Sequence, residues 1–156
     1  MLNPQSLRKM EGIHPDLRRV VMRAAELSPI DFIITEGVRS LKRQRELVEA
    51  GASQTFNSRH LSGMAVDFAP IVGGMLTWKW PPFRIVAQAF KQASRELGVP
   101  IAWGGDWRDY KDGPHIELDR RDYRPSWRNS LARPRSDMWR APGSPGAGGA
   151  PIFHAV

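Results

Sequence analysis

The sequence contains no cysteine, and this absence excludes two kinds of structure. Without thiols the chain has no disulfide framework and no thiolate metal site, so any metal must bind histidine, aspartate or glutamate. The same absence is compatible with reducing and with oxidising compartments. No apolar run approaches the ~20 residues of a membrane-spanning helix, so we expect no transmembrane segment.

The first ten residues lack the apolar centre of ~7–15 residues that a secretory signal requires. We therefore expect a protein that stays in the cytoplasm until something else releases it. The remaining composition, 41% hydrophobic and 25% charged, is that of a soluble globular protein. A chain of 156 residues fits one domain with a sizeable core.

Acidic residues are the minority among the charged ones, which leaves a formal net charge of +7. Such a charge attracts polyanions, whether nucleic acid, anionic lipid or an anionic cell wall. The C-terminal portion is especially rich in arginine: Arg120, Arg121, Arg124, Arg128, Arg133, Arg135 and Arg140. A solvated basic surface without a specific partner is an equally good interpretation of the charge alone.

Apolar spacing and breaker residues predict helices over residues 15–27, 40–50 and 81–97. Short strands are predicted over residues 32–35, 64–69, 100–103 and 115–118. Helices and strands do not alternate regularly, which favours an α+β fold with a small, mostly antiparallel sheet packed with about three helices. Residues 51–60 are polar and irregular, so His60 is expected at a loop-to-strand junction.

Regular patterning fails from about Arg133, and residues 141–150 are a low-complexity run of proline, glycine, alanine and serine. Such composition is typical of a flexible segment. We therefore predict one folded domain over residues 1–132 and a flexible Arg/Pro/Gly-rich tail over residues 133–156.

The segment from Ser58 to Asp67 contains the first candidate site residues. Asp67 interrupts an apolar strand, and a carboxylate in such a strand is costly unless it is paired, hydrogen-bonded or bound to metal. A structural ion pair with an arginine is the alternative for Asp67. Taken alone, His60 beside Arg59 in a polar loop is more typical of a surface residue than of a metal ligand.

Asp112 and His115 supply the second half of the candidate site. His115 begins an apolar strand, and Asp112 lies on the loop side, where a carboxylate can act as general base. The alternative for Asp112 is a turn former, since Asp-Gly is a common turn dipeptide. Glu117 is in phase with His115 and can orient its imidazole or pair with Arg120. Two imidazoles and a carboxylate suit a catalytic zinc with one open position, and hence amide hydrolysis.

These segments form the pattern Ser-x-His-x-x-Gly-x-Ala-x-Asp followed by carboxylate-x-x-His. Its matched positions are Ser58, His60, Gly63, Ala65, Asp67, Asp112 and His115. The pattern resembles the D-alanyl-D-alanine carboxypeptidase (VanY-like) zinc peptidases. Their relatives include D-Ala-D-Ala dipeptidases and phage L-alanyl-D-glutamate endopeptidases, and their fold is shared with the hedgehog signalling domain.

Two further segments extend the resemblance, which covers roughly residues 13–118. Upstream, Gly37-Val38-Arg39-Ser40 is followed by Gln44 and Leu47. Downstream, the segment Trp103-Gly104-Gly105-Asp106-Trp107 and the short chain are most similar to the phage endolysin branch.

The resemblance implies a role for each matched residue. His60, Asp67 and His115 are expected to bind Zn²⁺, and Asp112 to be the catalytic base. Many relatives have glutamate at that position, although some phage enzymes have aspartate. Arg39 is expected beside the scissile carbonyl, where it stabilises the oxyanion and contacts substrate; an ordinary arginine at a helix start is its alternative. Ser58 is expected to hydrogen-bond near the zinc ligands or the substrate.

The function implied is a zinc-dependent peptidoglycan endopeptidase, an endolysin that cuts the L-alanyl-D-glutamate bond of the stem peptide. Its expected partners are the stem peptide and the anionic wall, with no nucleic acid, and a monomer is expected. One alternative is a D,D-carboxypeptidase or dipeptidase on the same scaffold. Another is a non-enzymatic module that binds cell wall or nucleic acid.

Overall fold

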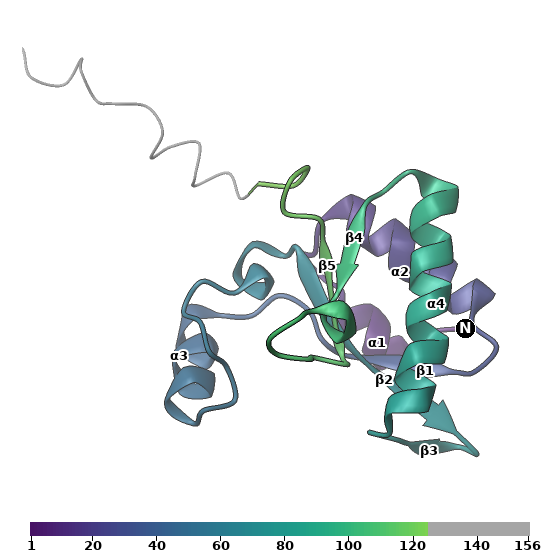
Figure 1. Cartoon of the computed structure of the whole chain (residues 1–156), viewed down its shortest axis with the longest axis horizontal. Helices are drawn as coiled ribbons and strands as arrows, with labels where there is room; N and C mark the ends of the chain where they lie inside the picture. The colour runs from purple at the N-terminus through teal and green to yellow at the C-terminus, as the bar shows by residue number, and fades with distance from the viewer. Residues whose placement is uncertain (125–156) are drawn as a thin grey trace, which may run out of the picture. The chain divides into compact units, whose positions relative to one another are not determined.

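The computed structural model describes residues 1–124, which form a small antiparallel sheet with helices packed against it (Figure 1). The α-helices are α1 (Pro4–Lys9), α2 (Pro15–Leu27), α3 (Leu41–Glu49) and α4 (Trp80–Leu97). The strands are β1 (Phe32–Glu36), β2 (Ala65–Val72), β3 (Met75–Leu76), β4 (Ile101–Trp103) and β5 (His115–Leu118). Short 3₁₀ turns η1 (Arg59–Ser62) and η2 (Gly104–Asp106) precede β2 and follow β4.

All strand pairs are antiparallel, in the order β1-β2-β5-β4, and β3 pairs with β2 as a hairpin. The α+β prediction is therefore confirmed. The predicted helix ends at Ser40 and Gly98 also agree with the structure, because capping residues determine both. The Ser40 hydroxyl accepts from the amide of Arg43 at 3.1 Å and begins α3, while Gly98, at φ 64°, ends α4 in the left-handed conformation that glycine adopts without strain.

Side chains along β2 and β5 alternate between the buried, apolar face of the sheet and its opposite, polar face. Val66 and Phe68 of β2, with Ile116 and Leu118 of β5, are buried in the core against α2 and α4. The intervening residues of these two strands, including Asp67 and His115, therefore project from the opposite face. One short sheet thus presents an apolar surface to the helices and polar side chains to the other side.

Three details differ from the sequence-based expectations. Helix α1 was not predicted, since its six residues are too few for a periodic pattern; it lies beside β1, and the Ser6 hydroxyl accepts from the amide of Ile34 at 3.0 Å. The two-residue strand β3 was also missed. His60 lies within η1 rather than in an irregular loop, and both it and Arg59 are buried.

The predicted boundary between residues 132 and 133, and the tail after it, lie outside the described residues and stay predictions. Within residues 1–124, no helix has both the length and the apolar character needed to cross a lipid bilayer.

Candidate metal centre and active-site cleft

Asp67 and His115 are direct partners across the β2–β5 strand pair. Glu36, at the end of β1, pairs with Asp67 from the other side, after an irregularity in the β1 register. The sheet therefore aligns one histidine and two carboxylates in a row across three strands. Directly opposed side chains on one sheet face are close enough to bind a common ligand.

His60 reaches the same point from η1. The Ser58 hydroxyl accepts from the His60 amide at 3.4 Å, and Gly63, at φ 66°, turns the chain into β2. A Cβ atom on Gly63 would lie 2.6 Å from the carbonyl oxygen of Gly12, so this turn requires glycine. The His60 Nδ1 atom donates to the Gly37 carbonyl at 2.8 Å, which leaves Nε2 to face Asp67 and His115.

Three donor atoms meet here in a nearly equilateral triangle. Nε2 of His60 lies 3.3 Å from Nδ1 of His115 and 3.3 Å from Oδ1 of Asp67, and the last two atoms are 3.2 Å apart. A tetrahedral ion with ligands at ~2.0–2.1 Å has donor–donor distances of about 3.3–3.4 Å. We name these three residues the donor triangle; their spacing and chemistry fit a tetrahedral metal ion.

The charges around the donor triangle favour a cation. Burial alone would lower the pKa of the His115 imidazole, but its hydrogen bonds with Asp67 and Glu117 raise that pKa to about 9. Burial would raise the pKa of the Asp67 carboxyl, yet hydrogen bonds with the two imidazoles hold it well below its usual range. A metal ion would supply the positive charge that this environment stabilises, in place of a proton.

Glu117 supports His115 from the side away from the donor triangle. Its Oε2 atom lies 3.1 Å from Nε2 of His115, and its Oε1 atom accepts from Nε of Arg120 at 2.5 Å. Burial opposes ionisation, but these two contacts lower the pKa of Glu117 to about 2. Both functions suggested by its sequence position, orienting the imidazole and pairing with Arg120, are therefore present together. Trp107 also packs on His115, with ring centroids 5.1 Å apart.

Arg39 is held against the site by several polar contacts. Its guanidinium pairs with Glu36, donates to Gln44 at 2.8 Å, and lies 3.5 Å from Oδ2 of Asp67, the oxygen outside the donor triangle. Its side chain is 8% exposed. The arginine partner expected in the alternative interpretation of Asp67 is therefore present, and the two imidazoles contact the same carboxylate.

Glu36 and Gln44 were not identified as site residues from the sequence. Gln44 is 1% exposed and connects Arg39 to the loop after α3, donating to the Ser53 hydroxyl at 2.9 Å and to the Thr55 carbonyl. Gln44 was noted only as a matched position of the resemblance, and nothing in the pattern of its own helix assigned it a role. Glu36 could have been noticed as a carboxylate ending a β-rich run beside Gly37.

Asp112 faces the same cavity, whose volume is about 330 Å³. Burial, with the nearby negative charge of Asp67, raises the pKa of the Asp112 carboxyl above its usual range. The residues that the structure describes form no hydrogen bond to this carboxylate. The backbone of Asp112 stabilises the turn, since its amide donates to the Gly104 carbonyl and its carbonyl accepts from the His115 amide. All six residues selected from the sequence line this cavity: Arg39, Ser58, His60, Asp67, Asp112 and His115.

Comparisons with known proteins identify the group to which this arrangement belongs. The family whose model matches residues 1–123 is described as phage L-alanyl-D-glutamate peptidase. The L-alanyl-D-glutamate peptidase of Escherichia phage T5 is 36% identical over 128 residues, covering 72% of this chain and 93% of the phage protein. The peptidoglycan L-alanyl-D-glutamate endopeptidase CwlK of Bacillus subtilis is 32% identical over 129 residues, covering 68% and 73%.

A solved structure gives the same result. The crystal structure of the Serratia marcescens L-Ala D-Glu endopeptidase ChiX superposes with a TM-score of 0.75 at 44% sequence identity. The match covers 79% of this chain and 93% of that one. The likeness therefore extends over nearly the whole of a solved relative and over the part of this chain that contains the donor triangle and Asp112.

Proposed function

The chain belongs to the phage L-alanyl-D-glutamate peptidase family, and from this we propose that it hydrolyses the L-alanyl-D-glutamate bond of the peptidoglycan stem peptide. The family identified from the sequence pattern is confirmed. The observation that carries the mechanism is the donor triangle, with Asp112 facing the same cavity.

The metal we propose is zinc, held by Nε2 of His60, Oδ1 of Asp67 and Nδ1 of His115. Two imidazoles and one carboxylate form a donor set that zinc accepts in catalytic sites, with one position left open. Zinc so bound would lower the pKa of a water molecule and polarise the carbonyl of the scissile bond. Glu117 and the Gly37 carbonyl hold the two imidazoles in the orientation that this binding needs.

Asp112 is the proposed general base and acid. Its carboxylate is partly buried in the cavity, and its raised pKa brings proton uptake closer to neutral pH. In the proposed reaction it takes a proton from the attacking water and then gives that proton to the leaving amine of D-glutamate. The turn that places it is tight, because a Cβ atom on Gly104 would lie 2.4 Å from the Asp112 carbonyl oxygen.

Arg39 is proposed to stabilise the negative charge that develops on the scissile carbonyl oxygen. Its guanidinium is fixed by Glu36 and Gln44 before substrate arrives, so little reorganisation is needed when charge appears. Ser58 lines the same cavity, and we propose that its hydroxyl also contacts substrate. The Ser58 hydroxyl also accepts a hydrogen bond from the His60 amide and so helps to position the η1 turn.

The net charge of +7 supports binding to an anionic wall rather than to a neutral surface. We propose that the protein works as a monomer at the cell wall after release from the host cytoplasm, with no nucleic-acid partner. If exposed charge concentrates the enzyme on the wall, added salt should reduce cleavage of whole sacculi. Cleavage of a small soluble stem peptide should change much less, since it depends on buried groups.

Digestion of purified sacculi tests the reaction directly. Mass spectrometry should find new D-glutamate N-termini, with L-alanine left on the sugar side. Release of free D-alanine instead would favour a D,D-carboxypeptidase. Strong binding to sacculi without cleavage, by protein that contains zinc, would favour a binding module.

A further inference from the structure

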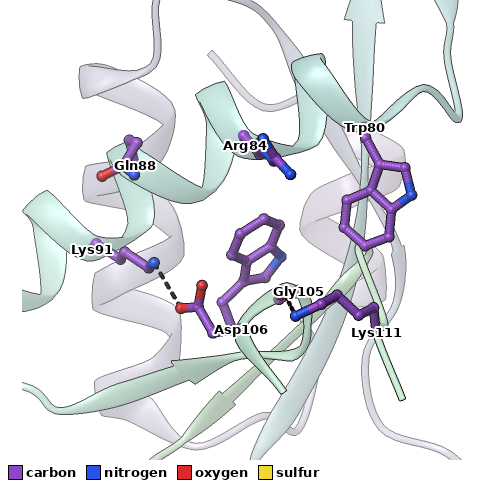
Figure 2. Close-up of a pocket in the computed structure, with 8 residues that line it drawn as sticks. Trp80, Arg84, Gln88, Lys91, Gly105, Asp106 and Lys111 are labelled. Carbon is purple, nitrogen blue, oxygen red and sulfur yellow. Dashed lines mark hydrogen bonds and ion pairs between the residues drawn. The ribbon is translucent and has the colours of Figure 1, made fainter. Parts of the chain in front are cut away.

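A second hollow lies between α4 and the loop that joins β4 to β5 (Figure 2). Its volume, about 690 Å³, exceeds that of the active-site cleft. Helix α4 contributes Trp80, Arg84, Gln88 and Lys91, and the opposite wall consists of Trp103, Gly105, Asp106 and Lys111. We call it the Trp80 groove. None of the proposed catalytic residues lines it, so the proposed chemistry does not explain it.

The groove has a fixed aromatic floor and an open aromatic wall. Trp103 is 6% exposed, and its Nε1 donates to the Gly113 carbonyl at 2.7 Å. Gly105 closes against its ring, where a Cβ atom would lie 2.3 Å from the nearest ring carbon. Trp80, by contrast, is 41% exposed and meets Trp103 edge-on, with centroids 6.3 Å apart. An exposed indole offers an apolar face, suited to the C–H face of a sugar ring, and a polar N–H.

The polar groups around this aromatic wall are mainly cationic. Lys91 pairs with Asp106 at 2.7 Å and lies 5.3 Å from the Trp103 ring centroid. Among the described residues 1–124, the Lys111 ammonium donates only to the backbone carbonyls of Gly105 and Trp107. Arg84 forms no ion pair with the residues that the structure describes. The lining therefore has three cations against one carboxylate, and its charge complements an acidic ligand.

One loop separates the Trp80 groove from the active-site cleft. Gly105, Asp106 and Lys111 line the groove, whereas Trp107 and Asp112 of the same loop line the cleft. The Trp103–Trp107 segment thus contributes to both cavities. A ligand bound in the groove is therefore held directly across this loop from the proposed general base.

We propose that the Trp80 groove binds the sugar chain of peptidoglycan while the stem peptide occupies the cleft. This inference rests on the proposed function, in which the L-alanine side of the cleaved bond leads back to the sugar. A hexosamine ring would stack on Trp80, with Gln88 and Arg84 donating hydrogen bonds to its acetamido and hydroxyl oxygens. Arg84 and Lys111 would attract the lactyl carboxylate of muramic acid units that carry no peptide.

Direct binding of a peptide-free disaccharide is the first test. N-acetylglucosaminyl-N-acetylmuramic acid is titrated into the full chain, and the indole N–H resonances are followed by NMR. We expect Trp80→Ala to weaken binding about tenfold, as removal of a central aromatic contact commonly does. Arg84→Gln should weaken it severalfold. The matched controls are Trp78→Ala and Arg95→Gln, because both residues are exposed and lie outside the groove.

Rates on two substrates supply the second test. Trp80→Ala and Arg84→Gln should lower cleavage of sacculi more than cleavage of a sugar-free stem peptide, while Trp78→Ala leaves that ratio unchanged. Arg84 is exposed, so its variant keeps the test valid if Trp80→Ala folds poorly. Absence of disaccharide binding to the wild type, or equal binding by the wild type and both groove variants, overturns the proposal. Failure of the wild type to expose D-glutamate termini would instead overturn the proposed function, which the disaccharide measurement does not involve.

Discussion

Glu117 accepts a hydrogen bond from Nε2 of His115 at 3.1 Å, and this contact leaves Nδ1 of the same imidazole facing Asp67. The two residues are next-nearest neighbours on β5 and therefore project from the same face of the sheet. A carboxylate in this position fixes the tautomer of a ligating histidine and raises its basicity. Arg120 in turn holds Glu117.

Replacing Glu117 with glutamine should weaken zinc binding without removing a ligand. The amide can still accept one hydrogen bond, but it lacks the charge that supports His115. We expect zinc affinity to fall ~10–100-fold, measured by competition with a chromogenic chelator. Glu46→Gln, at an exposed position of α3, is the matched control. Equal affinity in both variants would show that Glu117 serves only to pair with Arg120.

Removing a member of the donor triangle should remove the metal. Elemental analysis should find one zinc per wild-type chain and little in His60→Ala or His115→Ala. Zinc should also raise the melting temperature of the wild type, because a ligand that binds only the folded state stabilises it. His14→Asn is the control, since His14 lies outside the site and asparagine is a good helix cap. Full zinc occupancy in the two alanine variants would refute the ligand assignment.

Asp112→Asn should separate metal binding from catalysis. The amide keeps the shape of the side chain but cannot take up the proton, so zinc should be retained and turnover should fall ~10²–10⁴-fold. Asp109→Asn changes an exposed residue of the same loop that does not line the cleft, and should leave turnover unchanged. Near-normal turnover in Asp112→Asn would mean that Asp112 acts only in the turn.

The sequence predicted the parts of the fold and site that depend on local patterns. Helix caps such as Ser40 and the alternation of β2 act within a few residues. The same is true of the spacing between Ser58 and His60 and of that between Asp112 and His115. Ser58 and His60 were therefore found from short motifs, and the structure brings them to the cavity that also contains Asp112.

The sequence did not predict contacts between distant segments. The burial of Arg59 arises because its guanidinium donates to the carbonyls of Leu118 and Tyr123, more than fifty residues away. Gln44 owes its importance to Arg39 and to the loop after α3, and no pattern within its own helix reveals that. Helix α1 packs beside β1, and the sequence of a six-residue segment does not by itself predict such a contact.

The hydrogen bond from the Tyr123 hydroxyl to Asp16, 2.7 Å long, should make stability depend on pH at both extremes. It lowers the pKa of the Asp16 carboxyl, so its contribution should be present above about pH 4 and be lost as the solution becomes more acidic. It raises the pKa of Tyr123, so the contribution should also be lost well above about pH 10.

Tyr123→Phe should therefore reduce the free energy of unfolding at neutral pH. The expected loss is only about 1 kcal/mol, because Asp16 is partly exposed and water competes for the hydrogen bond. The difference from wild type should shrink at pH 3. Urea unfolding at both pH values measures it, with Tyr110→Phe as control because the described residues form no hydrogen bond to its hydroxyl. An equal difference at both pH values would show that packing rather than the hydrogen bond is responsible.

Truncation from the C-terminus should show where the catalytic domain ends. Deleting residues 133–156 should leave the melting temperature and the cleavage of a soluble stem peptide nearly unchanged, because the Pro/Gly-rich composition cannot bury a core. Deleting from Tyr123 onward should destabilise the fold, since it removes the contact with Asp16 and a carbonyl that holds Arg59 beside His60. Zinc affinity should then fall as well. A large loss of stability in the shorter deletion would contradict the predicted boundary, because residues after 132 would then contribute to the core.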